Sequence, residues 1–95
     1  HSIQAIHKEL LFELRDELLN KELQYEKLLL AKEVLHENEK MYAVLQSTAL
    51  SQNDALLSLL NVLMQMLEAQ KQMNQYTFAY NESVIKIYTL LGVKL

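Results

Sequence analysis

The sequence predicts an all-α protein whose two long helices fold back on each other as an antiparallel coiled-coil hairpin. Three observations lead to this fold class. The 95 residues include a single Gly and no Pro, so nothing in the composition interrupts a long helix. Good helix formers, namely Leu, Glu, Gln and Lys, are abundant. Apolar residues recur at helical spacing on both sides of one polar break, at residues 46–53.

The first helix is expected over residues 2–47, and it has two apolar faces. One face follows a spacing close to 3.5 residues, which is typical of a coiled-coil seam. It consists of Leu11, Leu14, Leu18, Tyr25, Leu28, Leu35, Tyr42 and Ala49. The other face follows an 11-residue period, which a nearly straight helix tolerates. It consists of Leu19, Leu23, Leu30, Val34, Met41 and Leu45.

Residues 48–53 are predicted to form the tip of the hairpin, and residues 54–91 the second helix. Ser51 followed by Asp54 has the spacing of a capping box, in which the two side chains satisfy each other's backbone amides at a helix start. Gly92 is expected to end the helix, because glycine readily adopts the left-handed conformation found after a helix C-terminus.

The second helix is too apolar to be covered on one side only. Its expected seam is Leu56, Leu59, Leu63, Met66, Met73, Tyr80, Val84, Ile87 and Leu91, with Leu57, Leu60, Met64, Leu67, Phe78 and Ile85 beside it. Of the 13 residues from Ala55 to Leu67, ten are hydrophobic and none is charged. We therefore expect the hairpin to self-associate or to form part of an α-helical barrel, with Leu56, Leu60, Leu63 and Leu67 as oligomer packing residues.

Charge and composition exclude several classes of function. The net charge is −3 and no cluster of Lys or Arg is present, so a nucleic-acid partner finds no support. The absence of Cys excludes disulfides and thiolate metal sites. The longest stretches without charge are 13 residues, shorter than the roughly 20 apolar residues of a membrane-spanning helix, so we expect this segment not to be membrane-embedded.

Few residues have the types and spacing of a catalytic or metal site. Glu33 and His36 have the Glu-x-x-His spacing of a helical metal site, but such a site needs a second pair and further carboxylates. No second pair is present in the sequence, and no nucleophile motif or Gly-rich loop accompanies the Ser, His and Asp residues. We therefore predict a protein that is not an enzyme and that has no catalytic, cofactor-binding or metal site. The chain begins at His1 without Met, and we expect it to be a piece of a longer protein.

From Val34 to Gly92 the order of residues resembles the TolC-like outer-membrane efflux channels. That family tends to show a tip Gly, a hydroxyl residue, an acidic residue, an apolar pair, Asp-Ala, a later Ala followed by Gln or Lys, an aromatic-x-Tyr step and Ala-Leu-Gly. The corresponding places hold Gln52, Ala55, Ser58, Leu59-Leu60, Asn61-Val62, Ala69-Gln70, Phe78-Ala79-Tyr80 and Leu90-Leu91-Gly92. Upstream, Ala31, Leu35 and Met41-Tyr42 resemble the preceding helix of the family.

The resemblance implies a segment of the periplasmic α-helical tunnel of a trimeric outer-membrane channel for efflux or type I secretion. It implies that the tip, Ser51, Gln52, Asn53 and Asp54, contacts a membrane-fusion adaptor protein. Ser58 and Asn61 take the constriction positions that are acidic in relatives, and Gln52 replaces the tip Gly. A cation-selective gate of carboxylates is therefore not expected at these positions.

Two other functional interpretations fit the same helical pattern. An adaptor-protein hairpin is the nearest rival, although the tip Arg and lipoyl-type strands of such adaptors are absent from the sequence. A coiled-coil scaffold or oligomerisation module needs the same seams but no tip chemistry. As an isolated hairpin, the chain is also compatible with a dimeric four-helix bundle.

Overall fold

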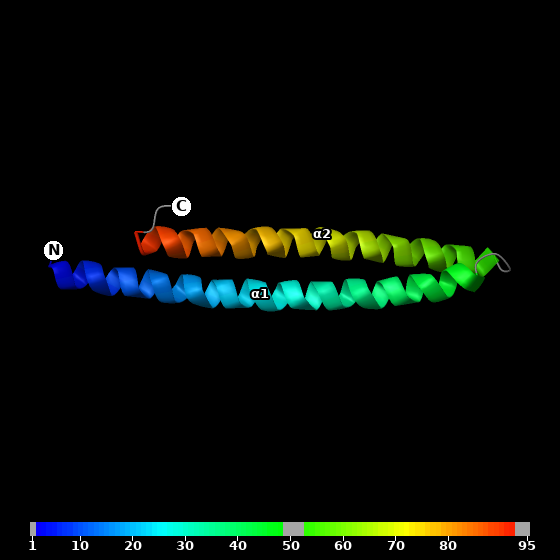
Figure 1. The fold of residues 1–95 in the computed structure, drawn as a ribbon, viewed down its shortest axis with the longest axis horizontal. Coiled ribbons are helices and arrows are strands. Elements are labelled where there is room, and N and C mark those ends of the chain that lie inside the picture. The colour runs from blue at the N-terminus through cyan, green and yellow to red at the C-terminus, as the bar shows by residue number, and fades with distance from the viewer. Residues whose placement is uncertain (1, 49–52, 93–95) are drawn as a thin grey trace. The chain divides into compact units, whose positions relative to one another are not determined.

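The computed structural model describes residues 2–48 and 53–92, and this part of the chain is built from two helices. Helix α1 spans Ile3–Thr48 and helix α2 spans Asn53–Leu90 (Figure 1). Each bound lies within one residue of the predicted helices at 2–47 and 54–91, so the two-helix, all-α prediction is confirmed. No strand occurs in the described ranges. Most of the predicted tip, residues 49–52, lies outside them.

Local signals in the sequence place the outer ends of both helices. At the start of α1, the backbone amide of Ala5 donates a hydrogen bond to Ser2 Oγ at 3.2 Å, so Ser2 is the N-cap residue. At the end of α2, Gly92 has a φ of 75°, in the left-handed region, and its amide donates to the carbonyl oxygen of Thr89 at 3.1 Å. The prediction that Gly92 ends the second helix is confirmed.

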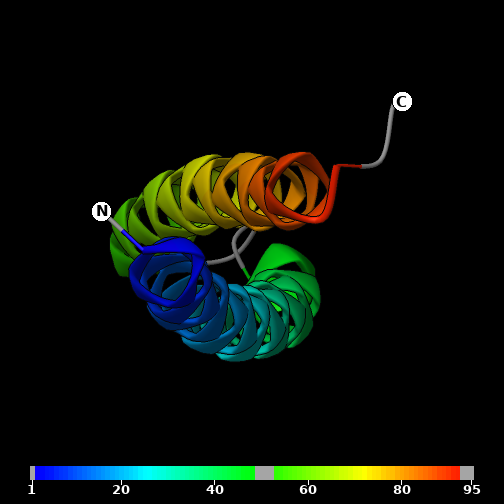
Figure 2. The ribbon, with the colours of Figure 1, turned by 90° about the vertical axis from the view of Figure 1, so that its left-hand side faces the viewer.

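The two helices pack against each other in two compact units. Unit 1 consists of His1–Lys27 and Tyr76–Leu95, and unit 2 of Leu28–Gln75. In unit 1, Asn20 contacts Ser83 and Tyr25 contacts Tyr80. Because the position on α2 falls as the position on α1 rises, the helices run antiparallel. Within this unit the blue part of α1 and the orange and red part of α2 lie side by side in two views turned by 90°, and the start of α1 extends beyond the red end of α2 (Figures 1 and 2).

The contact between the helices is a seam with alternating steps of three and four residues, the spacing of a coiled coil. The seam residues are buried or half-buried. In unit 1 they are Leu14, Glu17, Lys21 and Gln24 from α1, and Tyr76, Tyr80, Ser83, Ile87 and Leu90 from α2. In unit 2 they are Leu28, Ala31, Leu35, Asn38, Tyr42 and Leu45 from α1, and Leu59, Val62, Met66, Ala69 and Met73 from α2.

The predicted seam was partly wrong. Leu11, Leu18 and Tyr25 of α1 were expected in it, but their side chains are exposed. On α2, Leu56, Leu63 and Leu91 are likewise exposed. Both helices carry more apolar residues than one seam can hold. The register that forms follows the strict heptad, and in unit 1 it brings polar residues of α1 into the contact instead of these leucines.

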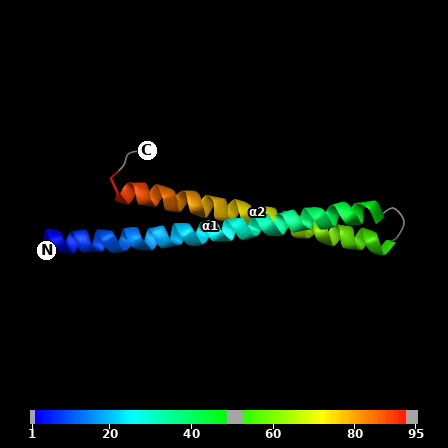
Figure 3. The ribbon, with the colours of Figure 1, turned by 60° about the horizontal axis from the view of Figure 1, so that its bottom comes forward.

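Small side chains occupy several of the most buried positions. Ala31 and Ala69 are buried in unit 2, and Ser83 is buried in unit 1. Small residues in a helix contact permit the two backbones to approach closely, because little side-chain volume separates them. By contrast, residues 3–12 of α1 are all exposed, and contact with α2 begins only at residues 13 and 14. In the orientation of Figure 3, this stretch is the blue start of α1, ahead of the red end of α2.

Neither helix, over its described length, carries an apolar stretch long enough to cross a membrane.

A matched pair of isoleucines tests the seam of unit 1. Ile87 is 9% exposed, whereas Ile85, two residues earlier on the same helix, is 52% exposed. We expect Ile87→Ala to lower the free energy of unfolding by about 2–3 kcal/mol, because it removes buried apolar atoms and leaves a void. Ile85→Ala should change it by no more than about 0.5 kcal/mol. Urea denaturation followed by circular dichroism measures both, and equal losses for the two variants would contradict this seam.

Candidate interaction surface

Unit 2 presents a stripe of four leucines on α2, Leu56, Leu60, Leu63 and Leu67, here called the leucine stripe. All four side chains are exposed, and Leu67 reaches 72%. Their steps of four, three and four residues are those of a coiled-coil seam, so the four side chains lie along one side of the helix. No charged residue occurs from Ala55 to Leu67. These residues were predicted to pack between subunits, and α1 leaves them uncovered for such a contact.

Of the other predicted positions, some lie within the described residues of α2 and others lie outside them. Ser58 and Asn61, the constriction-equivalent positions, are both exposed on α2 within unit 2. Asn53 and Asp54 fall in the first turn of α2. Ser51 and Gln52 lie outside the described residues, so the capping box and the adaptor contact remain predictions.

Helix α1 carries a second uncovered stripe in unit 2, formed by Leu30, Val34, Met41 and Val44, here called the α1 stripe. All four side chains are exposed. Two shallow surface hollows of about 300 and 330 Å³ lie along it, and Glu37 lines both. Leu30, Val34 and Met41 belong to the face predicted from the 11-residue period. Leu45 of that face is half-buried in the seam instead, and Val44 takes its place in the stripe.

The leucine stripe and the α1 stripe lie on opposite faces of the helix pair. Val34 and Met41 immediately precede the seam residues Leu35 and Tyr42, whereas Leu63 immediately follows the seam residue Val62. In an antiparallel coiled coil, positions that precede the seam face one another on one side, and positions that follow it face one another on the other. Unit 2 therefore offers one apolar stripe to each side, each from a different helix.

In unit 1, α1 turns polar residues toward α2 and leucines toward the outside. Glu17, Asn20 and Gln24 are half-buried at the contact. Leu11, Leu18, Leu19 and Leu23 are exposed. A shallow hollow of about 350 Å³ lies on this outer side of α1, lined by Leu11, Leu14, Arg15, Leu18, Leu19 and Glu22. Sequence reasoning found these leucines but placed Leu11 and Leu18 in the seam, because apolar residues were assumed to be turned inward.

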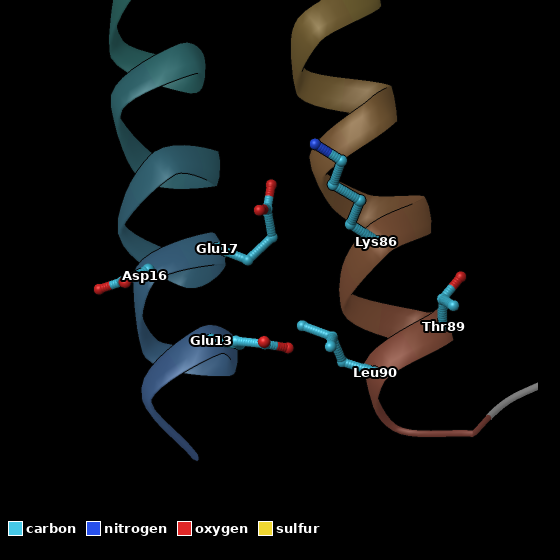
Figure 4. A pocket seen from close by; sticks show the side chains of 6 residues that line it. All are labelled: Glu13, Asp16, Glu17, Lys86, Thr89 and Leu90. Atoms are coloured by element: carbon cyan, nitrogen blue, oxygen red, sulfur yellow. The ribbon is translucent and has the colours of Figure 1, made fainter. Parts of the chain in front are cut away.

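A larger hollow of about 370 Å³ lies between the helices of unit 1 (Figure 4). The side chains of Glu13, Glu17, Lys86 and Leu90 point into it, whereas Asp16 points away. No nucleophile with a neighbouring base lines it, and its polar groups belong to the ends of long side chains at the edge of the seam. In the ranges 2–48 and 53–92, no three His, Asp or Glu side chains gather as a metal site requires. Glu33 and His36 are both exposed on α1.

Comparisons with known proteins found no relative of the chain, since no family model, no curated protein and no solved structure matches it.

The leucine stripe should make the chain associate with itself. We expect Leu60→Glu with Leu67→Glu to shift the sedimentation coefficient at micromolar concentration toward that of a monomer, because two charges would have to be buried in an apolar contact. Asn74→Glu with Asn81→Glu is the matched control, since it adds the same charges at the same seven-residue separation on exposed polar positions of α2 beyond the stripe. A wild-type chain that sediments as a stably folded monomer at every concentration would contradict the expectation.

Proposed function

We propose that the chain is one wall segment of the periplasmic α-helical tunnel of a trimeric, TolC-like outer-membrane channel for efflux or type I secretion. The observation that supports this best is the two-sided surface of unit 2, where the leucine stripe and the α1 stripe lie on opposite faces. A helical segment in a tunnel wall has a neighbour on each side, and each neighbour needs an apolar surface to pack against.

The residue order from Val34 to Gly92 gives this proposal its particular form. In it, neighbouring copies cover both stripes, and the tip at Ser51, Gln52, Asn53 and Asp54 contacts a membrane-fusion adaptor protein. Ser58 and Asn61 then line the constriction with neutral polar groups, so the aperture would be closed by helix packing and not by rings of carboxylates. Its place in the cell would be the periplasm, as part of an outer-membrane protein.

Substitution in the leucine stripe tests the transport function directly. We expect Leu60→Asp, introduced into the full protein in its own cell, to abolish export, because a carboxylate in an apolar helix contact prevents neighbouring segments from packing. Drug susceptibility and accumulation of an effluxed dye measure export, while immunoblotting confirms that the protein persists. Asn74→Asp, on an exposed polar position of the same helix beyond the stripe, is the matched control. Unchanged drug susceptibility in the Leu60→Asp cells would contradict the proposal.

A crosslinking experiment at the start of α2 distinguishes the proposed channel function from that of a coiled-coil scaffold. A photo-crosslinking residue in place of Asn53 should capture a periplasmic adaptor protein in intact cells, whereas the same residue in place of Asn74, an exposed position on α2 outside the tip, should not. Mass spectrometry identifies the captured protein. A scaffold would instead crosslink only to other copies of itself or to cytosolic proteins, and that result would count against the channel.

A further inference from the structure

The most buried side chain described in unit 1 is polar. Ser83 of α2 is 1% exposed, and it lies at a seam position where a coiled coil would normally place an apolar group. Its hydroxyl accepts a hydrogen bond from Asn20 Nδ2 of α1 at 2.9 Å. This hydrogen bond joins the two helices directly, across 63 residues of sequence.

Asn20 is held in place by its neighbours on α1. Its Nδ2 also donates to Glu17 Oε1 at 3.2 Å, and its Oδ1 accepts from Gln24 Nε2 at 3.3 Å. Both ends of the amide are therefore occupied, and the three α1 residues lie one helical turn apart on the side that meets α2. The side chain of Asn20 is oriented toward Ser83 before α2 contributes anything to the network.

The apolar seam residues of α2 in unit 1 discriminate poorly between registers. On α2 the seam residues repeat every seven positions, so a slip of one heptad replaces Tyr80 by Met73 or Ile87, and one apolar contact by another. At Ser83 the same slip brings Tyr76 or Leu90 opposite Asn20. The half-buried amide of Asn20 and the buried hydroxyl of Ser83 would then lose each other as partners, and a polar group left without a partner inside the contact is disfavoured.

We propose that the Asn20–Ser83 hydrogen bond fixes the register in which α1 and α2 pair in unit 1. The apolar seam residues hold the helices together, and this polar contact selects one alignment among those that the heptad repeat permits. This register depends only on interactions within one chain, and so it does not depend on the transport function proposed above.

Engineered cysteine pairs test the register, because the chain contains no Cys of its own. Leu14→Cys with Leu90→Cys reports the native alignment. His7→Cys or Lys21→Cys, each combined with Leu90→Cys, reports a slip of one heptad in either direction. Disulfide formation is measured at equilibrium in a glutathione buffer, and non-reducing gels at low protein concentration select the intramolecular product. With Asn20 and Ser83 present, the native pair should exceed either slipped pair by at least about tenfold.

The decisive experiment repeats this measurement in a chain that carries both Asn20→Leu and Ser83→Ala. Replacing both partners of a buried hydrogen bond by apolar groups leaves stability nearly unchanged, so the helices should still pair. We expect the preference for the native disulfide to fall by about tenfold or more, while the far-ultraviolet circular dichroism stays that of two helices. Asn81→Leu with Ser47→Ala makes the same two replacements at exposed positions and should leave the preference intact.

Two results would overturn the proposal. The first is an unchanged preference for the native disulfide in the Asn20→Leu, Ser83→Ala background, which would mean that apolar packing alone sets the register. The second is loss of folding in that background, which would assign the network to stability and not to alignment. Ser83→Ala alone gives an independent readout, because it should lower the melting temperature by leaving Asn20 unsatisfied, and adding Asn20→Leu should restore it.

Discussion

The narrowness of the contact between two helices governs the rest of this structure. A coiled-coil seam buries about two residues in every seven on each helix, whereas 51% of this chain is hydrophobic. Two helices therefore cannot cover the apolar residues that they carry, whatever register they choose. The leucine stripe, the α1 stripe and the outward leucines of unit 1 are all consequences of this excess.

The two units use their seams differently. In unit 2 the contact is mostly apolar, with Leu35, Val62 and Met66 among its members and Asn38 as a buried polar exception. In unit 1 the α1 side is largely polar, and α2 supplies most of the apolar atoms. A polar contact contributes less to stability than an apolar one, but it is far more selective about alignment. The apolar contact of unit 2 thus contributes more to stability, and the polar contact of unit 1 contributes more to the choice of alignment.

Much of the fold could be predicted because it depends on local signals. The absence of Pro, the single Gly and the hydroxyl group of Ser2 act within a few residues of where they lie, so the helix bounds were found to within one residue. The register could not be predicted in the same way. Leu11 and Leu14 are equally apolar and were expected on one face, yet only Leu14 lies in the seam, because the residues that meet α2 depend on the alignment of the two helices, which the pattern of a single helix does not contain.

The candidate surface follows from an uncharged run with coiled-coil spacing, which is a property of α2 alone. Its leucines are exposed, although Leu56 and Leu63 were also expected in the seam, and their packing between subunits stays a prediction. The network at Ser83 was missed because isolated Asn and Ser residues on long helices are usually solvated. Only the alignment of residues 63 positions apart makes them partners.

The first turns of α1 are stabilised differently from the remainder of that helix. The side chains of residues 3–12 are all exposed, so the described residues of α2 bury none of them and local helix propensity supplies most of the support for this stretch. A helical stretch of about ten residues is marginal in water, because nucleation is costly and tertiary packing supplies most helix stability. Its amide protons should therefore exchange with solvent much faster than those beyond Leu14, and a protease would be expected to cut there before it cuts the paired region.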